Sequence, residues 1–124
     1  MKPKIFVIDD QECFLESCQL TFEDDYIIKT TSSLDEFEES FTEEINESQA
    51  IIVDFRFGRQ TVLSWGFCDR IRRKFKYTGK MILFSVTSDF ESIGCDSVEI
   101  AKFDAIWDKE TDITLENLQH VLNS

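Results

Sequence analysis

The amino-acid sequence predicts an α/β fold in which a five-stranded parallel sheet is covered on both faces by alternating helices. First, the β-branched run that starts at Ala50 is typical of a strand buried on both faces, in the middle of such a sheet. Second, short apolar runs alternate with stretches whose apolar residues recur at helical spacing. Third, 124 residues suit one domain with a single core, expected to span residues 1–124.

The first three predicted strands enclose two predicted helices. Strands are expected at residues 5–8, 26–29 and 50–55, the first ending at Asp9-Asp10 and the third at Asp54. A helix is expected at residues 11–22, and a capping box of Ser33 and Glu36 opens the second helix. The residues expected on the buried faces of these helices are Leu15, Cys18 and Phe22, then Leu34, Phe37 and Phe41.

The second half of the chain continues the alternation. Strands are predicted at residues 81–84, closing on Ser85, and at 105–107, leading to Lys109. A weak helix is expected from about residue 96 to 102, with Val98 and Ala101 facing inward. The buried faces of the other two helices are predicted to consist of Cys68, Ile71 and Phe75, and of Leu115, Leu118 and Leu122. A solvated outer face is expected for Arg70, Arg72, Arg73, Lys74 and Lys76.

Charge and cysteine usage exclude several classes of function. With 13 basic and 25 acidic residues the net charge is −12, which argues against direct binding to nucleic acid. The four cysteines lack zinc-binding spacing, and the single histidine, His120, is expected on a helix surface. No signal peptide and no run of transmembrane length is present, so we expect a cytoplasmic protein without a membrane partner.

Polar side chains are expected at one edge of the sheet. Right-handed crossovers bring the carboxyl ends of all strands together there, and these ends carry Asp9, Asp10, Asp54, Ser85 and Lys109. Three converging carboxylates repel one another and need a cation, for which their oxygen atoms suit Mg²⁺ or Mn²⁺. A lysine beside such a site needs an anion to face. The pattern therefore predicts a site for a phosphoryl group on a carboxylate, with Asp54 as the nucleophile.

This order of residues resembles the response-regulator receiver domain, a flavodoxin-like fold of five β-α units, over essentially the whole chain. The resemblance implies that Asp54 accepts a phosphoryl group from a sensor histidine kinase or a phosphotransfer protein, and that the domain then switches a surface toward an effector protein. The domain would be no enzyme beyond its own phosphorylation and slow dephosphorylation. It would be either a single-domain receiver or the receiver part of a longer regulator.

The resemblance also implies roles for the other residues at this edge. Asp10 would bind the metal directly and Asp9 mainly through water, and the backbone carbonyl of Arg56 would supply a further ligand. Lys109 would pair with the phosphoryl group and Ser85 would hydrogen-bond it, although Thr87 is a competing hydroxyl. Charge neutralisation and positioning are most of what in-line phosphoryl transfer requires.

The sequence departs from the family pattern at three places. Glu110 replaces the proline that follows the lysine, which leaves the aim of Lys109 open, and Ile106 replaces the switch aromatic. The loop after Asp54 is longer, so that the comparable glycine is Gly66, four residues late. This loop carries Arg56, Arg59, Gln60 and Trp65, and we expect it to cover the site or alter partner choice.

Other functions fit less well. A pseudo-receiver that binds partners without being phosphorylated is the main alternative, motivated by Glu110, Ile106 and the altered loop. A flavodoxin-like cofactor binder would have a glycine- and hydroxyl-rich loop after the first strand, where this chain has Asp-Asp-Gln-Glu. An aspartyl phosphohydrolase would have a D-x-D motif there, which is absent. Trp65 and Trp107 are expected to be packing residues.

Overall fold

The computed structural model describes residues 2–58, 60–86 and 97–124. Its main strands are β1 (Lys4–Ile8), β2 (Ile27–Thr31), β3 (Ser48–Asp54), β6 (Lys80–Ser85) and β7 (Ala105–Asp108). Its helices are α1 (Glu12–Phe22), α2 (Leu34–Ser40), α3 (Phe67–Phe75), α5 (Ser97–Ile100) and α6 (Leu115–Leu122). Smaller elements are the 3₁₀ turns η1 (Ile45–Glu47) and η2 (Val62–Trp65) and the two-residue strands β4 (Arg56–Phe57) and β5 (Gln60–Thr61).

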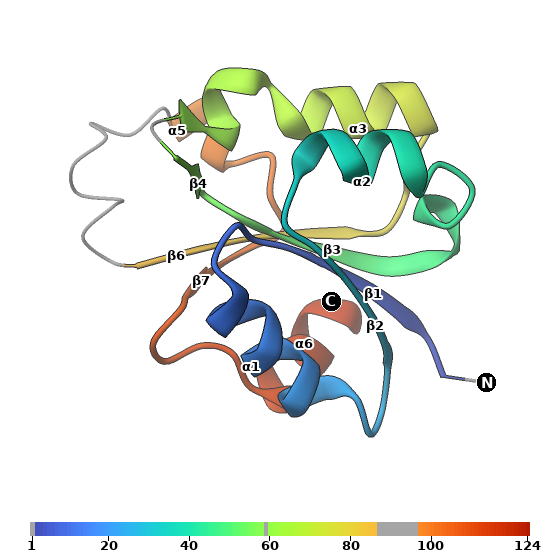
Figure 1. The fold of residues 1–124 in the computed structure, drawn as a ribbon, viewed down its shortest axis with the longest axis vertical. Coiled ribbons are helices and arrows are strands. Elements are labelled where there is room, and N and C mark those ends of the chain that lie inside the picture. The colour runs from blue at the N-terminus through green and yellow to red at the C-terminus, as the bar shows by residue number, and fades with distance from the viewer. Residues whose placement is uncertain (1, 59, 87–96) are drawn as a thin grey trace.

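The five main strands form one parallel sheet in the order β2-β1-β3-β6-β7. Helices α2 and α3 cover one face of the sheet and α1 and α6 cover the other (Figure 1). The predicted fold class is confirmed, with β3 in the centre. Because the chain passes from β1 to β2 on one side and returns to β3 on the other, the carboxyl ends of β1 and β3 flank the topological switch point, where ligands bind in such sheets.

The core explains why the predicted strands lack polar alternation. Successive side chains of a strand point to opposite faces. In β3, Ile51 and Val53 pack beneath α2 and α3, whereas Ala50 and Ile52 pack against the layer of α1 and α6. All four side chains are fully buried. A strand covered on both faces therefore reads as a continuous apolar run, as the sequence indicated.

Most predicted elements are found within a few residues of their expected bounds. The Ser33 cap is confirmed, since the Glu36 backbone N–H donates to its hydroxyl at 3.2 Å. The inward orientation predicted for Val98 and Ala101 is wrong: Val98 is 67% exposed and Ala101 is exposed as well. Helix α5 ends at Ile100, so helical periodicity does not continue, and Phe103 supplies the buried side chain instead. The predicted weak helix is found as α5, although it ends two residues early; its expected first residue, Asp96, lies outside the described residues, as do Thr87 and Arg59.

The solvated basic face predicted for α3 is wrong for two of its five residues. Arg70 pairs with Glu38 of α2 and donates to the Trp65 carbonyl. Arg72 donates to the carbonyls of Tyr77 and Gly79 at 3.0 and 2.6 Å. These two guanidinium groups hold α3 against its neighbours, while the other three basic residues are exposed as expected. Among the described residues, no helix is long and apolar enough to cross a bilayer.

Candidate functional site

The carboxyl ends of four neighbouring strands bring the predicted site residues to one edge of the sheet. Asp9 and Asp10 follow β1, Asp54 ends β3, Ser85 ends β6, and Lys109 follows β7. The parallel register holds them in place, because Asp54 pairs with Phe84, and Ser85 pairs with Asp108. The order of the strands in space thus places the acidic residues of β1 and β3 beside one another.

An ion-pair cluster occupies the centre of this edge. The Nζ atom of Lys109 lies 2.9 Å from Oδ2 of Asp9 and 2.9 Å from Oδ1 of Asp54. All three side chains are buried, with at most 5% of each exposed. Asp10 is exposed, but its carboxylate oxygen lies within 4.8 Å of oxygens of the other two aspartates. The structure therefore brings together the three carboxylates and the ammonium that the sequence singled out.

Two aromatic rings that the sequence reasoning missed enclose the ammonium group. Lys109 Nζ lies 4.2 Å from the ring centroid of Phe14, on α1, and 5.0 Å from that of Phe84, on β6. The negative faces of aromatic rings attract cations, most strongly where water is excluded. Phe14 lies outside the apolar spacing that predicted the buried face of its helix. Phe84 directly precedes Ser85 at the end of a predicted strand, so its position beside the site could have been predicted from the sequence.

Burial and mutual repulsion set the protonation of the cluster. Burial, with the neighbouring charge of Asp9, raises the pKa of Asp54 to about 7, although Lys109 and the Arg56 backbone N–H oppose the rise. Burial also raises the pKa of Asp9. For Lys109, burial works against the charged form, but hydrogen bonds to Asp9 and Asp54 outweigh it and raise its pKa. Lys109 thus stays charged, and one ammonium faces three carboxyl groups.

The donor set fits a hard divalent cation. Asp9 Oδ2 is buried beside the Lys109 ammonium, and no other described residue donates a hydrogen bond to it. Asp10 faces solvent, and among the described residues only the Gly58 backbone N–H donates a hydrogen bond to it, at 3.3 Å. Carboxylate oxygens without histidine or cysteine suit Mg²⁺ or Mn²⁺, which keep several water ligands. Asp9, Asp10 and Asp54 would hold such an ion, and a ligand role for the Arg56 carbonyl stays a prediction.

An acidic turn positions Lys109 in place of the missing proline. The Lys109 backbone N–H donates to the Ser85 carbonyl at 2.9 Å. On either side, Asp108 Oδ1 accepts from the Glu110 backbone N–H, and Asp112 Oδ2 accepts from the Asp108 backbone N–H, both at 2.8 Å. These bonds fix the backbone from which the lysine side chain extends. Glu110 therefore does not prevent Lys109 from reaching the aspartates.

Ser85 is not among the described residues that line the cavity beside the cluster. Ser85 is at its expected strand end but is fully buried, and on that side Val86 lines the cavity beside the cluster. Its predicted contact with a phosphoryl group stays a prediction.

Ile106, at the position of the switch aromatic, is an aliphatic side chain on β7 that is 42% exposed. His120 is exposed and Trp107 is buried against Phe22, as expected.

The loop after Asp54 forms one wall of the cavity beside the ion-pair cluster, which has a volume of about 410 Å³. Strands β4 and β5 pair as a small antiparallel hairpin whose turn includes Gly58 at φ +63°. Left-handed backbone of this kind favours glycine. The cavity is lined by Asp10, Gln11, Asp54, Arg56, Gly58, Val86 and Lys109. Part of the longer loop thus pairs as β4 and β5 beside the site.

Comparisons with known proteins identify the fold. No protein-family model matches the chain, and no curated protein sequence does. Among solved structures, a response-regulator receiver domain from Clostridium thermocellum has a TM-score of 0.75 at 20% identity, covering 98% of this chain and 91% of that one. A response regulator from Thermotoga maritima gives 0.75 at 17% identity and covers 100% of both chains. The chemotaxis response regulator CheY4 of Vibrio cholerae gives 0.71 at 17% identity, covering 98% and 99%.

These similarities extend over nearly the whole chain and show that it has the fold of response-regulator receiver domains. The flavodoxin-like prediction is confirmed. At such low identity the likeness concerns the backbone, and function has to be argued from the site.

Proposed function

We propose that this chain is a receiver domain of two-component signalling that accepts a phosphoryl group on Asp54. The observation that carries the proposal is the position of the Lys109 ammonium, 2.9 Å from both Asp54 and Asp9, with Asp10 beside them at the switch point. The receiver fold of the chain supports the proposal.

The chemistry follows from the charges. An Asp54 oxygen attacks the phosphorus of a phosphohistidine on a sensor kinase or phosphotransfer protein. The P–N bond breaks, an acyl phosphate forms, and the imidazole leaves with its electron pair and takes up a proton. Lys109 then pairs with a phosphoryl oxygen, and its distance from Asp54 makes this possible with little movement. A bound Mg²⁺ or Mn²⁺ would supply charge neutralisation at Asp9, Asp10 and Asp54.

Under this proposal the domain catalyses only its own phosphorylation and slow dephosphorylation. Its output is a change in a protein-binding surface that an effector recognises. Since Ile106 stands where a switching ring is expected and is partly exposed, the output relies on backbone and loop movements.

The test is phosphorylation with acetyl phosphate and Mg²⁺, followed by intact-mass spectrometry. We expect one added phosphoryl group on the wild-type chain, and none on Asp54→Asn or after removal of Mg²⁺ with EDTA. Asp24→Asn, an exposed aspartate at the opposite edge of the sheet, is the matched control and should be labelled normally. Labelling that persists in Asp54→Asn would reject the assignment of the acceptor.

A second candidate is a pseudo-receiver that binds partners regardless of phosphorylation. Burial of Ser85 away from the cavity wall favours it, because that wall then presents Val86 instead. The two candidates differ in their response to beryllofluoride with Mg²⁺, which imitates a phosphoryl group. Altered amide resonances around Asp54 support the phospho-acceptor, and unchanged resonances at saturating concentrations support the pseudo-receiver.

A further inference from the structure

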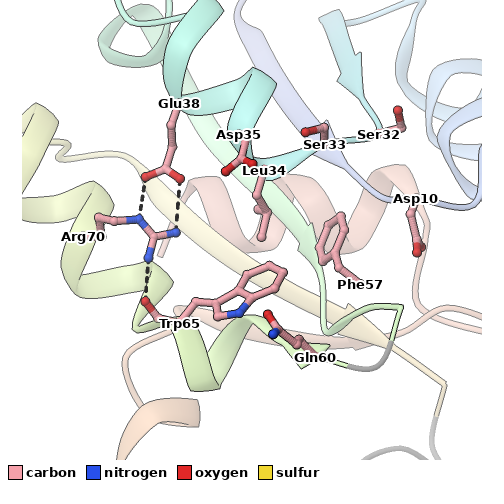
Figure 2. Close-up of a pocket in the computed structure, with 10 residues that line it drawn as sticks. All are labelled: Asp10, Ser32, Ser33, Leu34, Asp35, Glu38, Phe57, Gln60, Trp65 and Arg70. Atoms are coloured by element: carbon pink, nitrogen blue, oxygen red, sulfur yellow. Dashed lines mark hydrogen bonds and ion pairs between the residues drawn. The ribbon is translucent and has the colours of Figure 1, made fainter.

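A second hollow, of about 700 Å³, lies between the start of α2 and the hairpin of β4 and β5 (Figure 2). We call it the aromatic pocket. Of the described residues, it shares Asp10 alone with the cavity at the ion-pair cluster. Its lining consists of Asp10, Ser32, Ser33, Leu34, Asp35, Glu38, Phe57, Gln60, Trp65 and Arg70. The phosphoryl chemistry proposed above uses none of these residues except Asp10.

Aromatic rings form one wall of the aromatic pocket. The ring centroids of Phe57 and Trp65 lie 6.0 Å apart with the planes tilted by 36°, and both side chains are half-buried. Figure 2 shows the two rings next to each other, with Leu34 on the α2 side. Exposed aromatic surface beside a hollow provides a large contact area for a partner, and an indole face is the strongest ring site for a cation.

Among the described residues that line the aromatic pocket, the one basic side chain is already neutralised. Arg70 contacts both carboxylate oxygens of Glu38 and also donates to the Trp65 carbonyl, as the dashed lines in Figure 2 show. The other charged side chains among these described residues are the exposed carboxylates of Asp10 and Asp35. The aromatic pocket is therefore acidic, on a chain whose net charge is −12. An anion or a nucleic acid would be repelled.

We propose that the aromatic pocket binds a segment of a partner protein in which an arginine or lysine stands beside an apolar residue. The cationic head lies over Trp65 and reaches the Asp35 carboxylate, while the apolar neighbour packs on Phe57 and Leu34. Charge complementarity and the aromatic wall both select this occupant. The proposal does not depend on phosphorylation, and its test needs neither metal nor phosphoryl donor.

The test begins with a displayed library of random dodecapeptides, selected on the immobilised 124-residue chain. We expect enrichment of peptides that place arginine or lysine next to an aliphatic or aromatic residue. One enriched peptide is then titrated into the isotopically labelled chain while the two tryptophan indole N–H resonances are followed. The Trp65 resonance should shift, whereas that of Trp107, 4% exposed in the core, should stay in place.

Variants decide whether binding occurs in the aromatic pocket. Loss of the indole face in Trp65→Ala should weaken binding about tenfold. Asp35→Asn, on an exposed side chain, tests the charge without disturbing the core and should weaken binding about threefold. Asp24→Asn is again the control and should bind as the wild type does.

Three results would overturn the proposal. They are enrichment of acidic or purely apolar peptides, binding that Trp65→Ala and Asp35→Asn leave unchanged, and no enrichment over the unselected library. If a second copy of the chain covers the aromatic pocket instead, sedimentation will show a dimer that Trp65→Ala dissociates, which also contradicts the proposal.

Discussion

Two hollows lie side by side at the carboxyl edge of the sheet, and they are built in opposite ways. The cavity at the ion-pair cluster has buried charges set in fixed positions by strand ends and by Lys109. The aromatic pocket has the larger volume and exposes rings and carboxylates, and the ion pair of Arg70 with Glu38 lies at its side. Preorganised charge suits a small, highly charged group, whereas open aromatic surface suits a protein segment. Under the two proposals, phosphoryl chemistry and partner binding occupy different parts of the edge.

The largest effect on the contrast between the two hollows is expected from replacing Lys109. Lys109→Met should lower the free energy of unfolding by about 3 kcal/mol at pH 8, because it leaves two buried carboxylates without their counter-charge. Urea denaturation measures the loss. Lys102→Met is the matched control: Lys102 also contacts two carboxylates, Asp69 and Glu99, but at the surface, so its replacement should have a much smaller effect. Equal losses in both variants would contradict the view that burial makes the cluster special.

Replacing the central acid should change the pH dependence of stability. The pKa of Asp54 is raised in the folded state, to about 7, so folding favours its protonated form. The contribution of this carboxyl group to the free energy of unfolding is therefore greatest at acidic pH. It is lost as the pH rises through about 7 and the folded state is forced to ionise the group. In EDTA, Asp54→Asn should therefore gain stability over the wild type between pH 5 and pH 8. Urea midpoints measured across this range give the difference, and added Mg²⁺ should reduce it. If the difference in stability between the variant and the wild type does not change with pH, folding does not raise the pKa of Asp54.

A smaller effect is expected from the turn that aims the lysine. Asp112→Ala removes the acceptor of the Asp108 backbone N–H, which should cost about 1–2 kcal/mol of stability and slow labelling by acetyl phosphate. Asp112→Asn keeps an acceptor oxygen and should recover most of the labelling rate. If alanine and asparagine variants label equally fast, the turn does not position Lys109.

The smallest effect concerns the hairpin that separates the two hollows. Gly58→Ala puts a side chain at φ +63° and should destabilise the chain by about 1 kcal/mol. Thermal unfolding measures the loss. Gly58→Asn should be milder, because asparagine adopts left-handed backbone more readily. Since a Cβ at Gly58 meets no atom within 4 Å, equal and large losses from both would point to a crowded turn instead.

The sequence predicted the strand ends well and the loops poorly. Apolar runs terminated by Asp9, Asp54 and Ser85 located the edge of the sheet, because a doubly buried strand permits no other composition. Helical spacing failed at Val98, where the helix is too short to keep one face inward. Nothing in the spacing indicated that Phe14 would lie under the Lys109 ammonium, since that contact joins α1 to the end of β7.

The loop after Asp54 shows the same limit. Its length suggested a cover for the site, but the hairpin of β4 and β5 depends on pairing between Arg56 and Thr61 that composition does not reveal. The aromatic pocket likewise arises only when α2 and η2 are placed side by side. Likewise, the pairing of Arg70 with Glu38 requires contact between two helices. Contacts between separate helices, strands and turns are therefore what could not be predicted from the sequence.

The carboxylate of Asp10 belongs to both hollows, and one of its oxygens accepts a hydrogen bond from the Gly58 amide. An ion that draws this oxygen away leaves that amide without its acceptor. Deuterium uptake at a single backbone position thus becomes a gauge of ion occupancy. It also follows that neither hollow can be re-engineered through Asp10 without disturbing the other.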